Sequence, residues 1–174
     1  VAQAQAAGAP VQWIGADRGR AHELVGDPAS AQRFYAQALT AGGDASEVIL
    51  RLAISQAISG DGSAMERTLM PLLRKQDKPA WRARAFGLAI LGQGKEANRI
   101  VKTLLPGQLA DGITPYFEYM PRLTQAQQAA AANLGIFPRA SEIGRDETRL
   151  AALSRSAAGR DTGNGLVPSG RPLG

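Results

Sequence analysis

Three segments of this chain repeat one pattern at a nearly constant spacing. They begin at Gly26, Gly60 and Gly92, so successive starts are 34 and 32 residues apart. Their sequences are GDPASAQRFYAQAL, GDGSAMERTLMPLL and GQGKEANRIVKTLL. In each case the glycine ends one stretch of periodic apolar residues and opens a second. This period, made of two such stretches, predicts a row of helix–turn–helix units that bury their apolar faces against their neighbours.

The spacing of apolar residues inside the repeats is that of α-helices. After Gly26, one face of the predicted helix is formed by Ala31, Phe34, Tyr35, Ala38 and Leu39. Asp27 is the expected N-cap of this helix, with Pro28 at its first position. In the second repeat, Ser63 is expected to cap a helix that Pro71 kinks or ends early. The chain is therefore predicted to be all-α.

The first repeat resembles the tetratricopeptide repeat (TPR) family. In that consensus a Gly–Asp turn is followed by a small residue, an aromatic residue and an alanine; the matching residues here are Gly26, Asp27, Ala31, Tyr35 and Ala38. The resemblance covers about residues 12–106. It implies a right-handed α-solenoid whose concave groove binds a segment of another protein.

The other two repeats follow the TPR pattern less completely. The third has Gly92 and Ala97 at the expected positions, and Trp81 where the family prefers tryptophan. The second has Met65, Leu69 and Leu72 where smaller or aromatic residues are usual, so we expect a wider crossing of its helices.

A divergent pair of helices is expected to cap the array. Its first stretch, residues 114–123, is aromatic-rich and bounded by Pro115 and Pro121. Its second opens with Thr124 and Gln127, a capping-box spacing, and ends at Gly135. Ile136 and Phe137 are expected to fold back onto the array, because a terminal repeat must be closed off from water.

Three regions follow from this pattern. Residues 1–11 are predicted to be a flexible lead-in, and residues 12–138 the TPR-like α-solenoid. Residues 139–174, charged and then rich in glycine and proline, are predicted to be a linker or disordered unless a partner binds them, with one short charged helix around 146–156. The sequence starts with Val1 and not with Met, which suggests processing or truncation. It has no N-terminal Cys, so a lipoprotein is not expected.

Composition limits the kinds of partner. The net charge is +5 and the pI about 10.1, but basic residues are scattered and do not alternate with aromatic ones, so specific nucleic-acid binding is not expected. There are no cysteines, which excludes disulfides and thiolate metal sites. No run of 18 apolar residues occurs, so no transmembrane segment is expected, although peripheral contact with a membrane complex stays open.

No residue pattern supports catalysis. His22 is the only histidine, and a lone histidine on an amphipathic helix is more often packed or solvent-facing than catalytic. The GQGK at residues 92–95 lacks the spacing of a phosphate-binding loop. No metal-ligand cluster and no cofactor motif is visible, so the chain is predicted not to be an enzyme and to need no cofactor.

The predicted binding site is the groove lined by the first helix of each pair. The predicted groove residues are Arg20, Glu23, Leu50, Ile54, Arg82 and Phe86, with Leu24, Ile58 and Ile90 as further candidates. The alternative for the apolar ones, above all Ile58 and Ile90, is that they belong to the core. An apolar floor with flanking arginines suits a peptide that carries an acidic group. A secondary contact is predicted at Tyr116, Phe117 and Tyr119, for which packing of the final pair is the alternative.

A second resemblance concerns residues 115–146. This stretch is similar to one in alphaproteobacterial periplasmic TPR proteins, which often end in a peptidoglycan-binding SPOR domain, and to the TPR proteins of Flp/Tad pilus assembly that escort an outer-membrane secretin. The resemblance implies the periplasm or cell envelope, with the cytoplasm as the alternative. It also implies a protein-binding scaffold for a pilus, secretion or envelope component, a secretin among them. The alternative function is a stoichiometric structural subunit of a larger membrane-associated assembly, held by its outer helices and tail.

Overall fold

The structure, a computed structural model, describes residues 11–42 and 45–146, and within them it is all-helical. The described part contains eight α-helices and two short 3-10 helices, which confirms the predicted all-α class. The bounds are α2 Val11–Leu24, α3 Pro28–Thr40, α4 Ser46–Ile58, α5 Gly62–Leu73, α6 Lys78–Ile90, α7 Gly94–Leu104, α8 Gly107–Tyr119, η1 Met120–Arg122, α9 Gln125–Leu134 and η2 Ala140–Glu142.

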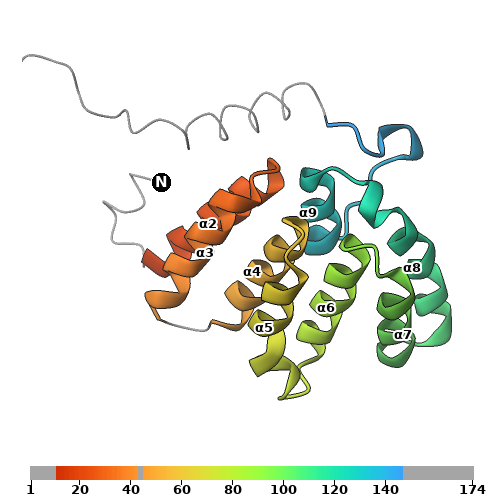
Figure 1. Cartoon of the computed structure of the whole chain (residues 1–174), viewed down its shortest axis with the longest axis horizontal. Helices are drawn as coiled ribbons and strands as arrows, with labels where there is room; N and C mark the ends of the chain where they lie inside the picture. Colours follow the sequence, from red (N-terminus) through yellow and green to blue (C-terminus); the bar gives the residue numbers. More distant parts are fainter. Residues whose placement is uncertain (1–10, 43–44, 147–174) are drawn as a thin grey trace, which may run out of the picture.

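Consecutive helices pack as neighbours in chain order, from α2 and α3 through α4, α5 and α6 to α7 and α8 (Figure 1). Each second helix also contacts the next pair, since α3 packs on α4 and α5 packs on α6. The first helices contact one another as well, α2 with α4 and α4 with α6. This is a helical, repeat-like fold, and the right-handed TPR solenoid stays a prediction within it.

The 34-residue period has a backbone origin. Gly26, Gly60 and Gly92 each lie in the turn between the two helices of a pair, with φ of 80°, 84° and 78°. Residues with a Cβ rarely adopt this left-handed conformation, so glycine is favoured at the same place in each repeat.

Aspartate side chains start three of the helices. Asp27, Asp61 and Asp77 each accept a hydrogen bond from the backbone N–H three residues on, at 2.8 to 3.0 Å. The cap at Asp27 confirms the prediction. The expected cap at Ser63 is wrong, because α5 begins at Gly62 and Asp61 caps it.

Two prolines lie inside helices rather than at their ends. Pro115 was expected to bound a helix, but α8 begins at Gly107 and runs through it to Tyr119. Pro71 does not break α5, which continues to Leu73. A proline inside a helix removes one hydrogen bond. Here packing of the helix on its neighbours outweighs that loss.

Glycines inside helices make room for large side chains on neighbouring ones. A Cβ added at Gly19 in α2 would lie 2.5 Å from the ring of Tyr35 in α3, and one at Gly87 in α6 would lie 2.1 Å from Sδ of Met65 in α5. The bulky Met65 of the second repeat therefore fits because its neighbour across the interface has no side chain. Both Tyr35 and Met65 are fully buried.

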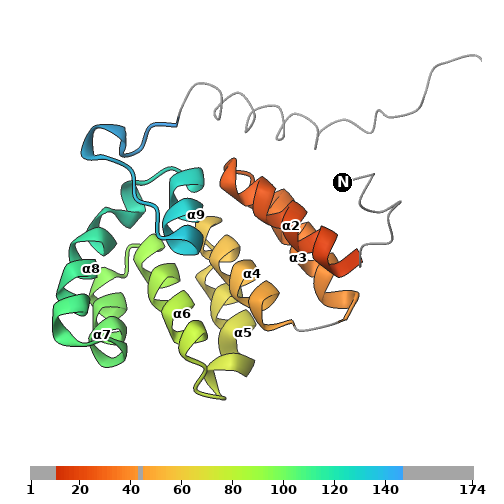
Figure 2. The same cartoon turned by 180° about the vertical axis from the view of Figure 1, so that it is seen from behind.

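The last helix turns back over the array. α9 contacts α2, α4 and α6, and in Figure 2 it lies in the middle of the helix row, beside the upper ends of α4 and α6. The face made by α2, α4 and α6, on which α9 lies, is called the inner face below. The predicted capping helix thus exists, but it covers the inner face more than it extends the row beyond α8.

The ends of α9 are as the sequence predicts. Thr124 and Gln127 form the capping box, and Gly135 ends the helix with φ of 69°. After it, Phe137 packs against the Tyr116 ring, with centroids 4.4 Å apart, so its predicted fold-back is confirmed. Ile136 stays 60% exposed, so its predicted burial is wrong.

Residues 139–146 continue against α9. The Gln127 side-chain amide donates to the backbone carbonyls of Glu142 and Arg145, at 2.7 and 2.8 Å, and accepts from the Gly144 N–H at 3.0 Å. Residues 1–10 of the predicted 1–11 lead-in and residues 147–174 of the predicted 139–174 tail, with most of its charged helix, lie outside the described residues. No described helix is both long enough and apolar enough to span a bilayer.

Candidate functional site

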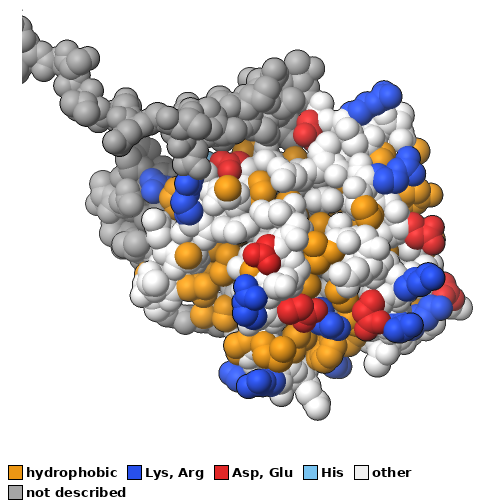
Figure 3. Space-filling model, in the orientation of Figure 1, with side chains coloured by type: hydrophobic (Ala, Val, Ile, Leu, Met, Phe, Trp, Pro, Cys, Tyr) orange, Lys and Arg blue, Asp and Glu red, His pale blue; other side chains and the backbone are white. Residues whose placement is uncertain are grey.

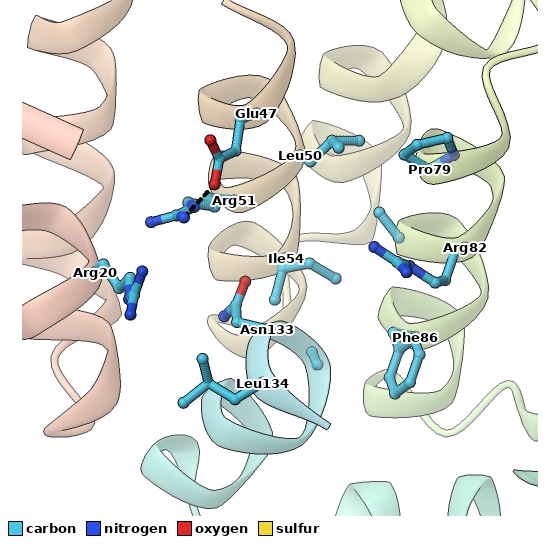
Figure 4. Close-up of a pocket in the computed structure, with 12 residues that line it drawn as sticks. Arg20, Glu47, Leu50, Arg51, Ile54, Pro79, Arg82, Phe86, Asn133 and Leu134 are labelled. Atoms are coloured by element: carbon cyan, nitrogen blue, oxygen red, sulfur yellow. Dashed lines mark hydrogen bonds and ion pairs between the residues drawn. The ribbon is translucent and has the colours of Figure 1, made fainter. Parts of the chain in front are cut away.

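A small cavity of about 130 Å³ lies on the inner face, where α2, α4 and α6 meet α9 (Figure 4). Its lining residues are Arg20, Glu47, Leu50, Arg51, Ile54, Pro79, Arg82, Ala83, Phe86, Ala132, Asn133 and Leu134. The structure therefore brings together five predicted groove residues from three helices: Arg20, Leu50, Ile54, Arg82 and Phe86.

Three arginines line this cavity from three successive first helices. Arg20 lies on α2, Arg51 on α4 and Arg82 on α6, and neighbours in this series are 31 residues apart in the sequence. Figure 4 shows them in that order across the site. Repetition of the helical pair places them at similar positions, since each falls on the same helix of its unit.

The arginines differ in what they contact. Arg51 pairs with Glu47 one turn earlier on α4. Neither Arg20 nor Arg82 forms a hydrogen bond or an ion pair with another described residue. Two guanidinium groups are thus free to receive an anion from outside. Sequence analysis missed Arg51, although its 31-residue spacing from the two predicted arginines was a usable signal.

An apolar slot adjoins the cavity along α6. It has a volume of about 240 Å³ and is lined by Lys78, Pro79, Arg82, Phe86, Val101, Leu104, Leu105 and Ile113. One of these lining residues, Phe86, packs its ring edge-on against the buried Phe117, with centroids 5.2 Å apart. The slot therefore combines apolar and aromatic lining residues with two basic ones, Lys78 and Arg82.

Glu23 is not available to a partner, and its prediction as a groove contact is wrong. It is 1% exposed. Its Oε2 accepts hydrogen bonds from Tyr35 Oη and from Asn133 Nδ2, both at 3.0 Å. Helix α9 covers this carboxyl group, and amphipathic periodicity in α2 does not reveal a helix that returns from so far along the chain.

The surroundings of Glu23 favour its neutral form. Burial raises the pKa of this carboxyl to about 7, although the hydrogen bond from Tyr35 and the charge of Arg51 act in the opposite direction. Oε1 has no hydrogen-bond partner within the described residues. Burial and the adjacent Glu23 carboxyl raise the pKa of Tyr35, so its hydroxyl stays a donor.

The other candidates divide between core and surface. Ile58 and Ile90 are buried in the core, and Leu24 is partly buried against it, as the alternative interpretation had it. Phe117 is 1% exposed, which corrects its prediction as a contact residue. Tyr116 and Tyr119 are 45% and 42% exposed and remain accessible.

His22 has a structural setting. Its Nδ1 lies 3.0 Å from Oδ2 of Asp27, and its ring stacks on Phe34 with centroids 5.2 Å apart. These contacts link the end of α2 to the start of α3. In residues 11–42 and 45–146, no group of three or more His, Asp or Glu side chains could hold a metal ion.

Charges of both signs are mixed on the face that Figure 3 shows, where red and blue side chains lie close together. A surface of this kind differs from the continuous basic face that nucleic-acid binding uses.

Comparison with protein-family models, with curated proteins and with solved structures gave no match for this chain. Its role must therefore be argued from its own geometry.

Proposed function

We propose that this chain is a non-enzymatic scaffold of TPR type in the bacterial cell envelope, which binds a pilus, secretion or envelope component through its inner face. The observation that supports the binding role most directly is the cavity where Arg20, Arg51 and Arg82 surround Leu50 and Ile54. Apolar contacts supply affinity at such a site, while placed charges supply orientation and specificity.

The envelope assignment rests on the similarity of residues 115–146 to periplasmic TPR proteins. The same stretch includes α9, which helps to form the cavity through Asn133 and Leu134. A secretin or another component of a pilus or secretion machine is the kind of partner this assignment implies, and the protein would work in the periplasm.

Affinity capture of the intact chain from membrane and periplasmic fractions of its source cell tests this function. Arg82→Glu reverses one free charge of the site, and Arg67→Glu makes the same change at an exposed position on α5. We expect the first variant to lose the envelope protein that wild type retains, and the second to keep it. Equal retention by both variants would contradict binding through the inner face.

Phe86 is a poor target for this test. It is largely buried and packs on Phe117, and truncating such a residue to alanine costs about 3–5 kcal/mol of stability. Loss of binding in that variant would not separate contact from unfolding. Arg82 is exposed, so its replacement leaves the fold intact.

The second candidate function, a stoichiometric subunit of a larger assembly, is favoured by a different surface. Leu109, Tyr116 and Tyr119 on α8 are 62%, 45% and 42% exposed at the end of the helix row. Tyr116→Glu would then release the chain from its complex, whereas Arg82→Glu would not. Limited proteolysis of residues 147–174 adds a discriminator, because a subunit's tail is protected in the native complex and a free adaptor's tail is cut.

A further inference from the structure

The inner-face cavity and the apolar slot lie next to each other on α6. Pro79, Arg82 and Phe86 line both, so the two hollows adjoin at this face of α6. Helix α9 borders the cavity half, where it contributes Asn133 and Leu134. The slot half is bordered instead by α7 and α8. This combined surface is called the α6 groove below.

The α6 groove has a one-sided charge. Its basic lining residues are Arg20, Arg51, Lys78 and Arg82. Glu47 is its one acidic lining residue, and it pairs with Arg51. Because the remaining cations lack such a partner among the described residues, the groove attracts anions, whereas the face in Figure 3 carries both signs of charge.

The two halves of the groove differ in chemistry. The slot half is lined by the apolar residues Val101, Leu104 and Ile113 together with Phe86. The cavity half carries Arg20 and Arg51 beside the Asn133 amide. An occupant that satisfies both halves must be apolar at one end and acidic at the other. Arg82 lines both halves, so it would contact the part of the occupant where the apolar end joins the acidic end.

We propose that the α6 groove binds an acidic peptide segment of the partner protein, with one bulky apolar side chain in the slot and carboxylates at Arg82 and Arg20. This inference rests on the proposed function and specifies the chemistry of its partner. A guanidinium binds a carboxylate through two parallel hydrogen bonds, and a buried apolar anchor supplies most of the energy of such contacts.

A peptide fits the groove better than a nucleic acid does. Single strands bind to exposed aromatic faces beside basic residues. Among the described residues that line the groove, the one aromatic residue is Phe86, which is 7% exposed and packs against Phe117. A phosphate group alone would leave the apolar slot unfilled, so the slot favours a ligand with an apolar side chain.

Selection of peptides on the intact chain tests the proposal without knowledge of the natural partner. A random twelve-residue phage-display library is selected on the immobilised wild-type chain. We expect the enriched peptides to share one bulky apolar residue followed on one side by two or more Asp or Glu. Enriched peptides that are neutral or basic, or no enrichment at all, would overturn the proposal.

The best enriched peptide, made synthetically with a fluorescent label, then locates the site. Its affinity should fall at least tenfold with Arg82→Glu, with Arg20→Glu and with Ile113→Glu in the slot. It should stay within about twofold of wild type with Arg67→Glu, and it should weaken as salt rises from about 0.05 to about 0.5 M. Helical circular dichroism checks that each variant is folded. If Arg67→Glu lowers the peptide's affinity as much as the groove variants do, the peptide is attracted by net charge only, and the proposed site is wrong.

Two further results separate the proposals. If a single-stranded oligonucleotide competes with the peptide and loses affinity in the same groove variants, the occupant is a nucleic acid and the inference fails. If envelope-protein capture depends on Arg82 but the selected peptides are not acidic, the proposed function stands and its partner chemistry is wrong. If capture is indifferent to Arg82, the proposed function itself fails.

Discussion

Asn133 in α9 donates a hydrogen bond to the buried carboxyl of Glu23 in α2, with Nδ2 and Oε2 3.0 Å apart across 110 residues of sequence. The same oxygen accepts from the Tyr35 hydroxyl of α3. One carboxyl group therefore joins the first pair of helices to the last helix. The face of α9 that packs on the array is mostly alanine, with Ala126, Ala129 and Ala131 buried.

We predict that Asn133→Ala destabilises the protein by about 1–3 kcal/mol, because it removes a donor from a buried acceptor. Small alanine methyls bury little apolar area, so a polar contact carries a larger share of the energy that holds α9. Urea unfolding followed by circular dichroism measures the change. The control is Gln125→Ala, an exposed position in the same helix, which should change stability by less than about 0.5 kcal/mol. Equal effects would show that the Asn133 contact is not important.

We predict that stability falls as pH rises from about 4.5 to about 7. Burial raises the pKa of Glu23 from an ordinary value of 4.5 to about 7, so the folded state holds a proton that the unfolded state releases. A group whose pKa is higher in the folded state stabilises that state fully at any pH below its unfolded pKa. This contribution is lost as the pH rises from about 4.5 to about 7. The expected loss is on the order of 3 kcal/mol.

Comparison with Glu23→Gln isolates this effect, because Gln keeps the shape and cannot ionise. The charged and polar groups around Glu23 are Arg51, Tyr35, Asn133 and Ser55, and all four remain in the variant. The difference in unfolding free energy between wild type and variant should decline as pH rises from about 4.5 to about 7 and then level off. A difference independent of pH would contradict a raised pKa.

We predict that Gly87→Ala destabilises the protein although alanine is the better helix former. Its Cβ would lie 2.1 Å from Met65 Sδ and 3.4 Å from the Ala57 Cβ, and overpacking of this kind costs about 1–3 kcal/mol. In contrast, a Cβ at Gly112 in α8 meets nothing within 4 Å, so Gly112→Ala should stabilise by up to about 1 kcal/mol. Thermal melting of the two variants should move in opposite directions; a shift in the same direction would show that the α5–α6 contact can relax.

Local signals in the sequence predicted much of the fold. The recurrent glycines, the cap at Asp27 and the Thr124 capping box depend on residues within a few positions of one another, and the structure has them as expected. Repetition also predicted which helices share a face, which is why Arg20 and Arg82 meet at one cavity.

Local sequence patterns did not predict the contacts between segments that lie far apart in the chain. Periodicity gives the face of α9 but not the surface on which it lies, so the burial of Glu23 was missed. It gives no warning that Gly87 leaves space for Met65, because the two residues pair only across an interface. Phe117 was placed in an exposed cluster because three aromatic residues within four positions cannot all be assigned to one side without a neighbour.

Our last prediction concerns the Arg51–Glu47 pair in the groove. Glu47→Gln leaves Arg51 without its anion, so an acidic peptide bound in the α6 groove should gain affinity, by about threefold to tenfold. Stability should change by less than about 1 kcal/mol, because Glu47 is 72% exposed and exposed ion pairs contribute little. Glu96→Gln frees Arg99 in the same way on α7, outside the groove, and should leave affinity unchanged. Fluorescence polarisation with the selected peptide measures both. A gain shared by the two variants would mean that net charge, and not the position of Arg51, governs binding.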